Sequence, residues 1–119
     1  MPPRVLSLTD QARHLDAPWS PRILAEPNSQ VVKLARTEGD FVWHQHDDGD
    51  ELFLVVEGRL EIDFEDGSVA LEAGQLCLVP RGLRHRPRGE ALILLVEAAT
   101  TRNTGEVEHA LTREELERA

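Results

Sequence analysis

From Val31 onward the chain consists of short runs of Val, Leu, Ile and Phe separated by turns that contain glycine. Each run has the length of a β-strand, and the runs show no helical period. The pair Asp66-Gly67 lies between two of them and is a strong hairpin signal. Seven or eight such strands favour a sandwich or a small barrel. We therefore expect an all-β fold, with strands at residues 31–36, 41–46, 51–57, 59–64, 68–72, 75–80 and 91–98.

The two ends of the chain depart from this pattern. The first thirty residues contain five prolines, which predicts an extended arm with one short helix near Thr9–Leu15. Near the other end, Thr112 and Glu115 match a capping box, so we expect a short helix to begin there. These observations divide the chain into an N-terminal arm (1–30), a single barrel domain (31–100) and a C-terminal tail (101–119).

Charge and composition exclude several classes of partner. The net charge is −9, so the surface repels nucleic acid and anionic membranes, and we expect neither as a partner. The single cysteine, Cys77, forms no intrachain disulfide and fits a reducing compartment. The longest apolar run, residues 91–96, is the length of a strand, and the first residues do not resemble a signal peptide. We expect a soluble, cytoplasmic protein.

The stretch WHQHDDGDE places two histidines one residue apart and a glutamate five residues after the second. Alternate side chains of a strand share a face, so His44 and His46 point the same way. The DDGD turn then returns Glu51 beside them. Imidazole nitrogens and a carboxylate oxygen suit a divalent transition ion. Taken alone, the stretch fits either a metal site or the polar end of a hairpin.

A second stretch, GQLCLVPRGLRH, supplies a third histidine after a strand and a Pro-x-Gly turn. Together the two stretches resemble the two motifs of the cupin superfamily. The first motif is matched by His44-x-His46, four residues, Glu51, six residues and Gly58, and the second by Gly74, five residues, Pro80-x-Gly82, two residues and His85. There are two departures: Gly39 precedes His44 by one residue fewer than usual, and Gly89 replaces a closing Asn that is not a metal ligand in the family.

The resemblance implies a small cupin jelly-roll β-barrel, a double-stranded β-helix of six to eight strands, with a short terminal helix or arm. It also implies one divalent transition metal ion, Fe, Mn, Ni, Zn or Cu, held by His44, His46, Glu51 and His85. Such a ligand set leaves coordination positions open, as in a reactive or ligand-binding centre and unlike a sealed structural zinc site.

Other polar and aromatic residues are expected to have structural roles. Strand parity points Arg84, Arg86 and Arg88 outward, away from His85, and leaves Arg81 as the one arginine that reaches toward the pocket. Phe53 and Val55 share the face of Glu51 and are expected to line the pocket. Cys77 is expected to be buried and inert. The residues expected on the surface or in a solvated turn are His14, His109, Asp47, Asp48 and Asp50, and Trp43 is expected to face away from the histidines.

Two functions remain open at this point. The first is a metal-dependent enzyme acting on a small molecule, of the oxygenase, isomerase or decarboxylase type. The alternative is a non-catalytic module that binds or senses a small molecule through a metal-anchored pocket. Because a small open jelly roll leaves edge strands exposed, and because similar cupins commonly pair, we expect a homodimer in either case.

Overall fold

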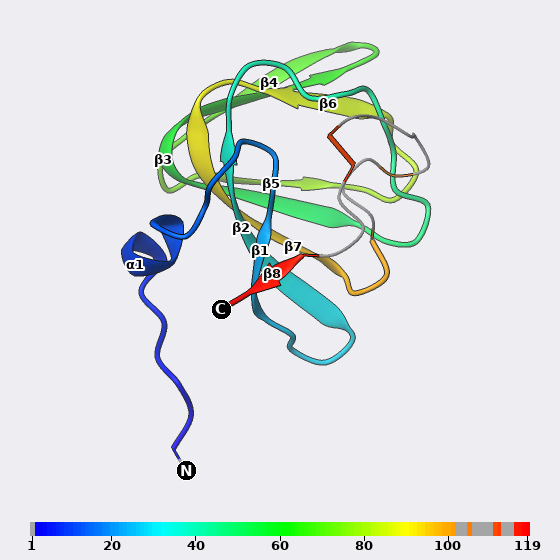
Figure 1. Ribbon diagram of the computed structural model, residues 1–119. Coiled ribbons are helices and arrows are strands. Elements are labelled where there is room, and N and C mark those ends of the chain that lie inside the picture. The colour runs from blue at the N-terminus through cyan, green and yellow to red at the C-terminus, as the bar shows by residue number, and fades with distance from the viewer. Residues whose placement is uncertain (1, 102–104, 106–110, 113–115) are drawn as a thin grey trace.

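The computed structural model describes all residues except 1, 102–104, 106–110 and 113–115. It contains one short helix and eight strands (Figure 1). In chain order they are α1 (Leu8–Ala12), β1 (Arg22–Ala25), β2 (Gln30–Thr37), β3 (Glu51–Phe64), β4 (Gly67–Glu72), β5 (Leu76–Val79), β6 (His85–Arg88), β7 (Ala91–Ala98) and β8 (Glu117–Arg118). The expected all-β jelly roll is therefore confirmed, although its sheet does not close into a complete barrel.

The long strand β3 belongs to both layers of the jelly roll. Its first half pairs with β5 and β7, and its second half pairs with β4 and β6. The strand bends between these halves, where the register with β7 shifts between Val55 and Glu57. Gly58 follows with a φ of +82°, and a Cβ there would lie 2.4 Å from the carbonyl oxygen of Glu90, so only glycine fits. The two strands predicted on either side of Gly58 are thus one bent strand.

Alternate residues of the strands point into the space between the layers. Phe53 and Val55 of β3 meet Ile93 and Leu95 of β7 there. Together with residues of the second layer they form one buried apolar cluster: Ala35, Phe53, Val55, Leu60, Ile62, Leu71, Val79, Ala91, Ile93 and Leu95. On the opposite face of the sheet, Ala12 of α1 packs near Leu34 and Leu92 and covers part of it.

The predicted strand at residues 41–46 is wrong. His44 pairs with His85 through two backbone hydrogen bonds of 2.8 and 2.9 Å, but the bridge is isolated. Phe41 donates its N–H to the carbonyl of Pro87, and a proline has no N–H to return. The carbonyl of Val42 accepts instead from the ring of His44. A regular ladder therefore cannot extend along this segment.

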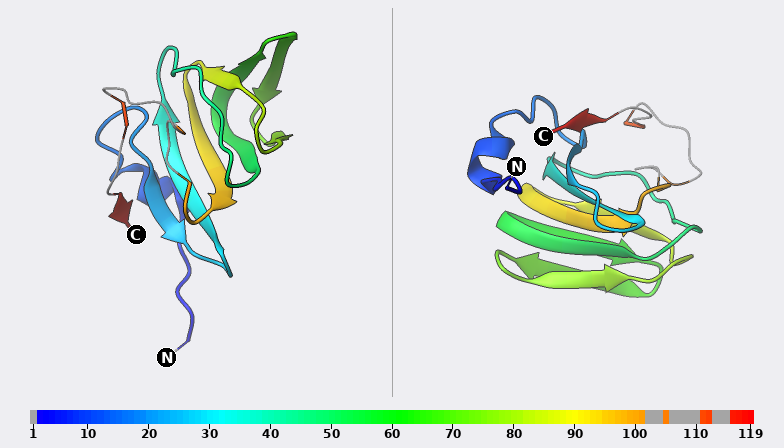
Figure 2. Two further views of the ribbon diagram at one scale, coloured as in Figure 1. Left: turned by 90° about the vertical axis from the view of Figure 1, so that its right-hand side faces the viewer. Right: turned by 90° about the horizontal axis from the view of Figure 1, so that it is seen from below.

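The terminal segments agree only partly with expectation. The helix α1 is shorter than predicted and is capped by Ser7, whose hydroxyl accepts from the N–H of Asp10. The expected arm contains β1, and the residues before α1 extend away from the body of the molecule (Figure 2). The helix expected from Thr112 falls on residues 113–115, outside the described part, and Glu117–Arg118 form β8, parallel to β1. The hairpin at Asp66-Gly67 is confirmed, with Phe64 opposite Gly67.

The sequence contains no apolar run of membrane-spanning length, and the helical structure can be compared with that. Among the described residues, none of the helical structure is long and apolar enough to span a membrane.

Candidate metal centre

The four predicted ligands come together inside the jelly roll. His44 and His46 lie on the irregular segment before β3, Glu51 is the first residue of β3, and His85 is the first residue of β6. Their candidate ligand atoms all lie within 4.8 Å of one another. All four side chains are buried. The DDGD turn and the Pro-x-Gly turn thus bring three separate segments to one point, as the motif spacing predicts.

Backbone carbonyls orient two of the imidazole rings. Nδ1 of His44 lies 2.9 Å from the carbonyl oxygen of Val42, and Nδ1 of His85 lies 2.8 Å from that of Leu83. A carbonyl oxygen only accepts hydrogen bonds, so we assign the proton of each neutral ring to Nδ1. Each Nε2 then keeps its lone pair. This is the arrangement in which a histidine binds a metal through Nε2.

The third imidazole has no hydrogen-bond partner within the part of the chain that the structure describes. Both ring nitrogens of His46 are buried without one, although Nε2 lies 3.3 Å from Oε1 of Glu51. The same oxygen lies 3.2 Å from Nε2 of His85. A buried polar group without a partner costs about 1–3 kcal/mol. A cation among these atoms would satisfy Nε2 of His46 and Oε1 of Glu51 together, so the donor set fits a divalent ion.

Burial and neighbouring groups keep the ligands in their metal-binding forms. Burial, assisted by the nearby His85, lowers the pKa of His44 to about 4. Burial alone would raise the pKa of Glu51, but the close approach of His46, His85 and Glu97 to its carboxylate holds that pKa well below its usual range. At neutral pH His44 is therefore uncharged and Glu51 is ionised. These are the protonation states that metal coordination requires.

Two further charged residues reach the centre and were missed from the sequence. Glu97 lies directly opposite Glu51 in the pairing of β7 with β3, and its carboxyl is 2.6 Å from Nζ of Lys33 on β2. Both side chains are buried. Burial, and then the charge of Glu51, raises the pKa of Glu97 well above its usual range. The sequence did contain a signal for them: each of these ionisable residues stands between apolar residues at an inward-facing position of its strand.

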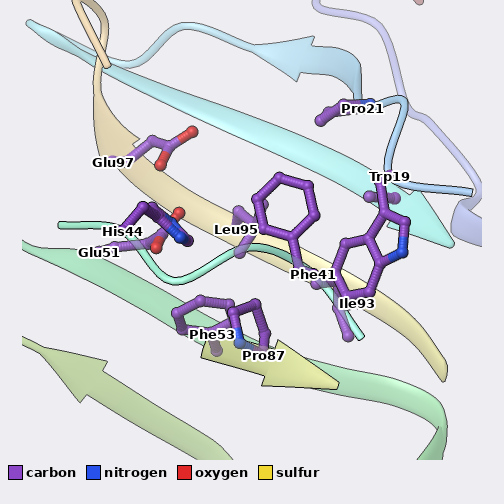
Figure 3. A pocket seen from close by; sticks show the side chains of 11 residues that line it. Trp19, Pro21, Phe41, His44, Glu51, Phe53, Pro87, Ile93, Leu95 and Glu97 are labelled. Carbon is purple, nitrogen blue, oxygen red and sulfur yellow. The ribbon is translucent and has the colours of Figure 1, made fainter. Parts of the chain in front are cut away.

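An apolar pocket lies beside the ligands (Figure 3). His44, Glu51 and Glu97 form its polar end, and rings and aliphatic side chains form the rest. The remaining lining residues are Trp19, Pro21, Ala35, Phe41, Phe53, Pro87, Ile93 and Leu95. Phe53 lines the pocket as expected, whereas Val55 lies in the core and is not part of the lining.

Two aromatic residues are placed differently from the strand pattern. Alternation along the strand expected at residues 41–46 would turn Phe41, like Trp43, away from His44, yet the ring of Phe41 meets the ring of His44 edge-on, with centroids 5.3 Å apart. The parity argument fails because residues 41–46 are not a regular strand. Trp19 comes from the N-terminal arm and stacks on Phe41 at 4.6 Å. Its indole N–H donates to the carbonyl of Glu38, which holds the ring in place.

The arginines of the second motif face outward, as expected. Arg86 and Arg88 both bind the carboxylate of Asp63, and these hydrogen bonds, those of Arg88 first, hold the pKa of Asp63 far below its usual range. Arg84 and Arg86 lie over the ring of Trp43, with distances of 5.0 and 5.3 Å to its centroid. Trp43 thus points away from the centre.

The remaining predicted residues have local roles. Arg81 is exposed, does not line the pocket, and donates its backbone N–H to Asp50. Asp48 accepts from Thr100 and Thr101 in the turn after His46. Cys77 is half-buried, less than expected, and burial raises the pKa of its thiol. His14 is exposed, and Asp47 lies exposed in the same turn as Asp48. His109 lies outside the described residues.

Comparisons with known proteins agree with the fold and the motifs. Residues 30–96 match the family model of the cupin domain. The chain therefore belongs to the cupin family. It is 40% identical over 85 residues to the uncharacterized protein YdbB of Bacillus subtilis, covering 71% of this chain and 73% of that one.

Solved structures are similar as well. A cupin-2 domain protein from Shewanella frigidimarina is 41% identical with a TM-score of 0.76, and the match covers 79% of this chain and 94% of that one. A protein from Neisseria meningitidis is 28% identical with a TM-score of 0.74, covering 81% of this chain and all of that one.

We predict that the purified protein binds close to one divalent transition ion per chain. Replacing His46 or His85 by alanine removes a ligand and is expected to weaken zinc binding by more than about 100-fold, because loss of an outer-shell partner alone costs 10–100-fold. The control His14→Ala changes an exposed histidine and is expected to bind zinc normally. Elemental analysis measures the metal and circular dichroism checks the fold. Full metal content in folded His46→Ala and His85→Ala proteins would show that the site lies elsewhere.

We also predict that the metal-free protein loses stability as the pH falls from about 6.5 to 4. In this window unfolded His44 takes up a proton that the folded, buried ring refuses, so the unfolded state binds more protons and acid favours it. At about 1.4 kcal/mol per pKa unit, the shift of the His44 pKa from 6.5 to about 4 corresponds to about 3.5 kcal/mol in all, most of which is lost within this window. Urea unfolding in the presence of a chelator measures it. His44→Gln should flatten this dependence and His14→Gln should not; equal slopes for all three proteins would contradict the assignment.

Proposed function

We propose that this cupin is a metal-dependent enzyme that acts on a small molecule, in a reaction of the oxygenase, isomerase or decarboxylase type. One observation carries the proposal: two of the four convergent ligands, His44 and Glu51, form part of the polar end of an apolar pocket. A purely structural metal site needs no such pocket. A divalent ion with an open position supplies Lewis acidity, and with a redox-active metal also oxygen chemistry.

The residues of the chain have separate tasks in this proposal. His44, His46, Glu51 and His85 hold the ion. The pocket side chains exclude water, which strengthens electrostatic interactions at the polar end. Glu97 touches Glu51 and is anchored by Lys33, so it fixes the orientation of the carboxylate ligand. This arrangement is rigid, because each member is buried and contacts another.

The proposal is tested by loading the metal-free protein separately with Fe(II), Mn(II), Ni(II), Zn(II) and Cu(II) without oxygen. Each form is then screened against small carboxylic acids and phenols, with and without oxygen, following oxygen uptake and product formation. We expect turnover with one of these ions, and loss of at least about 100-fold in His85→Ala, which lacks a ligand. The control Trp43→Phe alters the outer face and should keep the activity. Ligand binding without turnover under every condition would favour the alternative, a non-catalytic sensing module.

We further propose that the protein is a homodimer, as the sequence suggested. Two cross-strand rows of apolar residues lie on the outer face of the sheet, and one of their residues, Leu94, also packs against the apolar cluster that includes Ala12 of α1. They are paired by register across β7, β3 and β5: Leu94, Leu54 and Leu76 in one row, and Val96, Leu52 and Leu78 in the other. Leu76 and Leu78 are 61% and 53% exposed. Two chains of charge −9 repel each other, so a contact between them is most favourable where charged side chains are absent. These rows contain no charged side chain and are apolar, so we place the second copy here.

The dimer is tested with the double variant Leu76→Asp and Leu78→Asp. Light scattering is expected to give twice the chain mass of 13.4 kDa for the unmodified protein at micromolar concentration and the chain mass for the variant. Negative charges on both copies would face each other across the contact. Val69→Asp is the matched control, because Val69 is also exposed but lies on β4 in the other layer. A monomeric unmodified protein, or a dimeric double variant, would rule out this interface.

A further inference from the structure

The lining of the pocket restricts the ligand more narrowly than the metal does. The chain contains only two Trp, three Phe and no Tyr. Three of these five aromatic residues, Trp19, Phe41 and Phe53, line this one pocket, although they come from the arm, the irregular segment and β3. Their rings gather beyond the polar end (Figure 3). Aromatic faces and edges attract a further aromatic ring beyond the effect of area alone.

The charges around the pocket exclude strongly anionic ligands. Among the described residues, no lysine or arginine lines it. The nearby ammonium group of Lys33 is paired with the carboxyl group of Glu97, and the arginines of the second motif face outward. A phosphate or a second carboxylate would therefore find no counter-charge beyond the ion, and would lie against apolar walls at a large desolvation cost.

The free space requires a small, flat ligand. The centre of a water molecule can occupy about 30 Å³ in the pocket. This holds roughly two or three waters, at about 10–15 Å³ each. A thin ring can enter if the side chain of Trp19 shifts and its indole N–H gives up the hydrogen bond to Glu38, while the backbone bond of Trp19 to Arg36 on β2 stays in place. A bulky sugar ring with its hydroxyl groups cannot, and its polar groups would find few partners there.

Resting on the proposed metal centre, we infer that the pocket takes a small aromatic molecule that carries one oxygen group. The ring lies against Phe41, Phe53 and Trp19. The oxygen group lies at the polar end, beside His44, Glu51 and Glu97, where it reaches the ion. The ligand is uncharged or carries a single negative charge.

Trp19 provides a direct probe of this ligand. In the variant Trp43→Phe, Trp19 is the only indole of the chain, so its fluorescence reports on the pocket alone. The zinc-loaded variant is titrated with benzoate, cyclohexanecarboxylate and glucose 6-phosphate. Zinc does not change oxidation state, so binding is separated from turnover. Benzoate and cyclohexanecarboxylate have the same charge and ring size, so their difference isolates the aromatic face.

We expect a saturable fluorescence change with benzoate and an affinity about 2- to 10-fold higher than for cyclohexanecarboxylate. Glucose 6-phosphate is expected to give no change at the same concentrations. Phe41→Leu, made in the same background, keeps the wall apolar and should reduce the preference for the aromatic ring, since Phe53 and Trp19 remain. Calorimetry on the unmodified protein is the control and should give the same benzoate affinity, since Trp43 lies outside the pocket.

Equal or tighter binding of cyclohexanecarboxylate or glucose 6-phosphate would overturn the inference, as would an unchanged preference in folded Phe41→Leu protein. The ligand comparison in the Trp43→Phe protein decides the matter even if Phe41→Leu does not fold. Elemental analysis before the titration separates this inference from the proposed function. If the protein holds no zinc, the metal-dependent function fails, and the metal-free protein should still prefer benzoate over cyclohexanecarboxylate through the ring contacts.

Discussion

Pairing along β3 holds the two layers of the jelly roll together. Strands β5 and β7 pair with its first half and β4 and β6 with its second, so a single bent strand carries hydrogen bonds to four others. The bend at Gly58 depends on the absence of a side chain. The position of the candidate centre follows from this geometry. Glu51 begins the strand, and His85 lies opposite Phe64 at its far end, yet the bend returns both residues to the same interior space.

The interior contains an unusual number of polar groups for so small a core. Three histidines, Glu51, Glu97 and Lys33 are all buried next to apolar side chains. Backbone carbonyls accept from His44 and His85, and Lys33 pairs with Glu97. Buried ion pairs seldom add net stability, because the loss of hydration offsets the attraction. The cluster therefore costs stability, and buried groups with displaced pKa values are commonly found at functional sites.

The two outer faces of the molecule have contrasting chemistry. On β3 and β6, Arg86 and Arg88 bind Asp63 and cover the surface with paired charges. On β3, β5 and β7, the outward residues are mainly leucine and valine. The same strand β3 contributes to both faces, because its bend places its two halves in different layers. A charged face is suited to solvent and an apolar one to a protein contact.

Much of the fold and site could be predicted from the sequence, because both depend largely on the spacing of residues that are close together in the chain. Period-two runs and Gly turns predict strands, and the HxH and Pro-x-Gly motifs predicted which four side chains meet. Prediction from local spacing failed where the structure of a segment depends on the strand that it pairs with. The six residues around His44 are not a strand, since Pro87 opposite has no N–H to donate. The two strands around Gly58 proved to be one, since pairing with β7 continues up to Gly58 and pairing with β4 begins at the next residue.

Only the tertiary structure decided what surrounds the candidate ligands. Trp19 lies more than twenty residues before His44, in an arm without periodicity, and it reaches the pocket only because the chain folds back along β2. The ion pair of Lys33 with Glu97 joins strands that are distant in sequence but adjacent in the sheet. The sequence by itself determined the kinds of residue at the centre and the turns that bring them together. Which distant segments enclose that centre depends on packing between layers, and no local pattern records it.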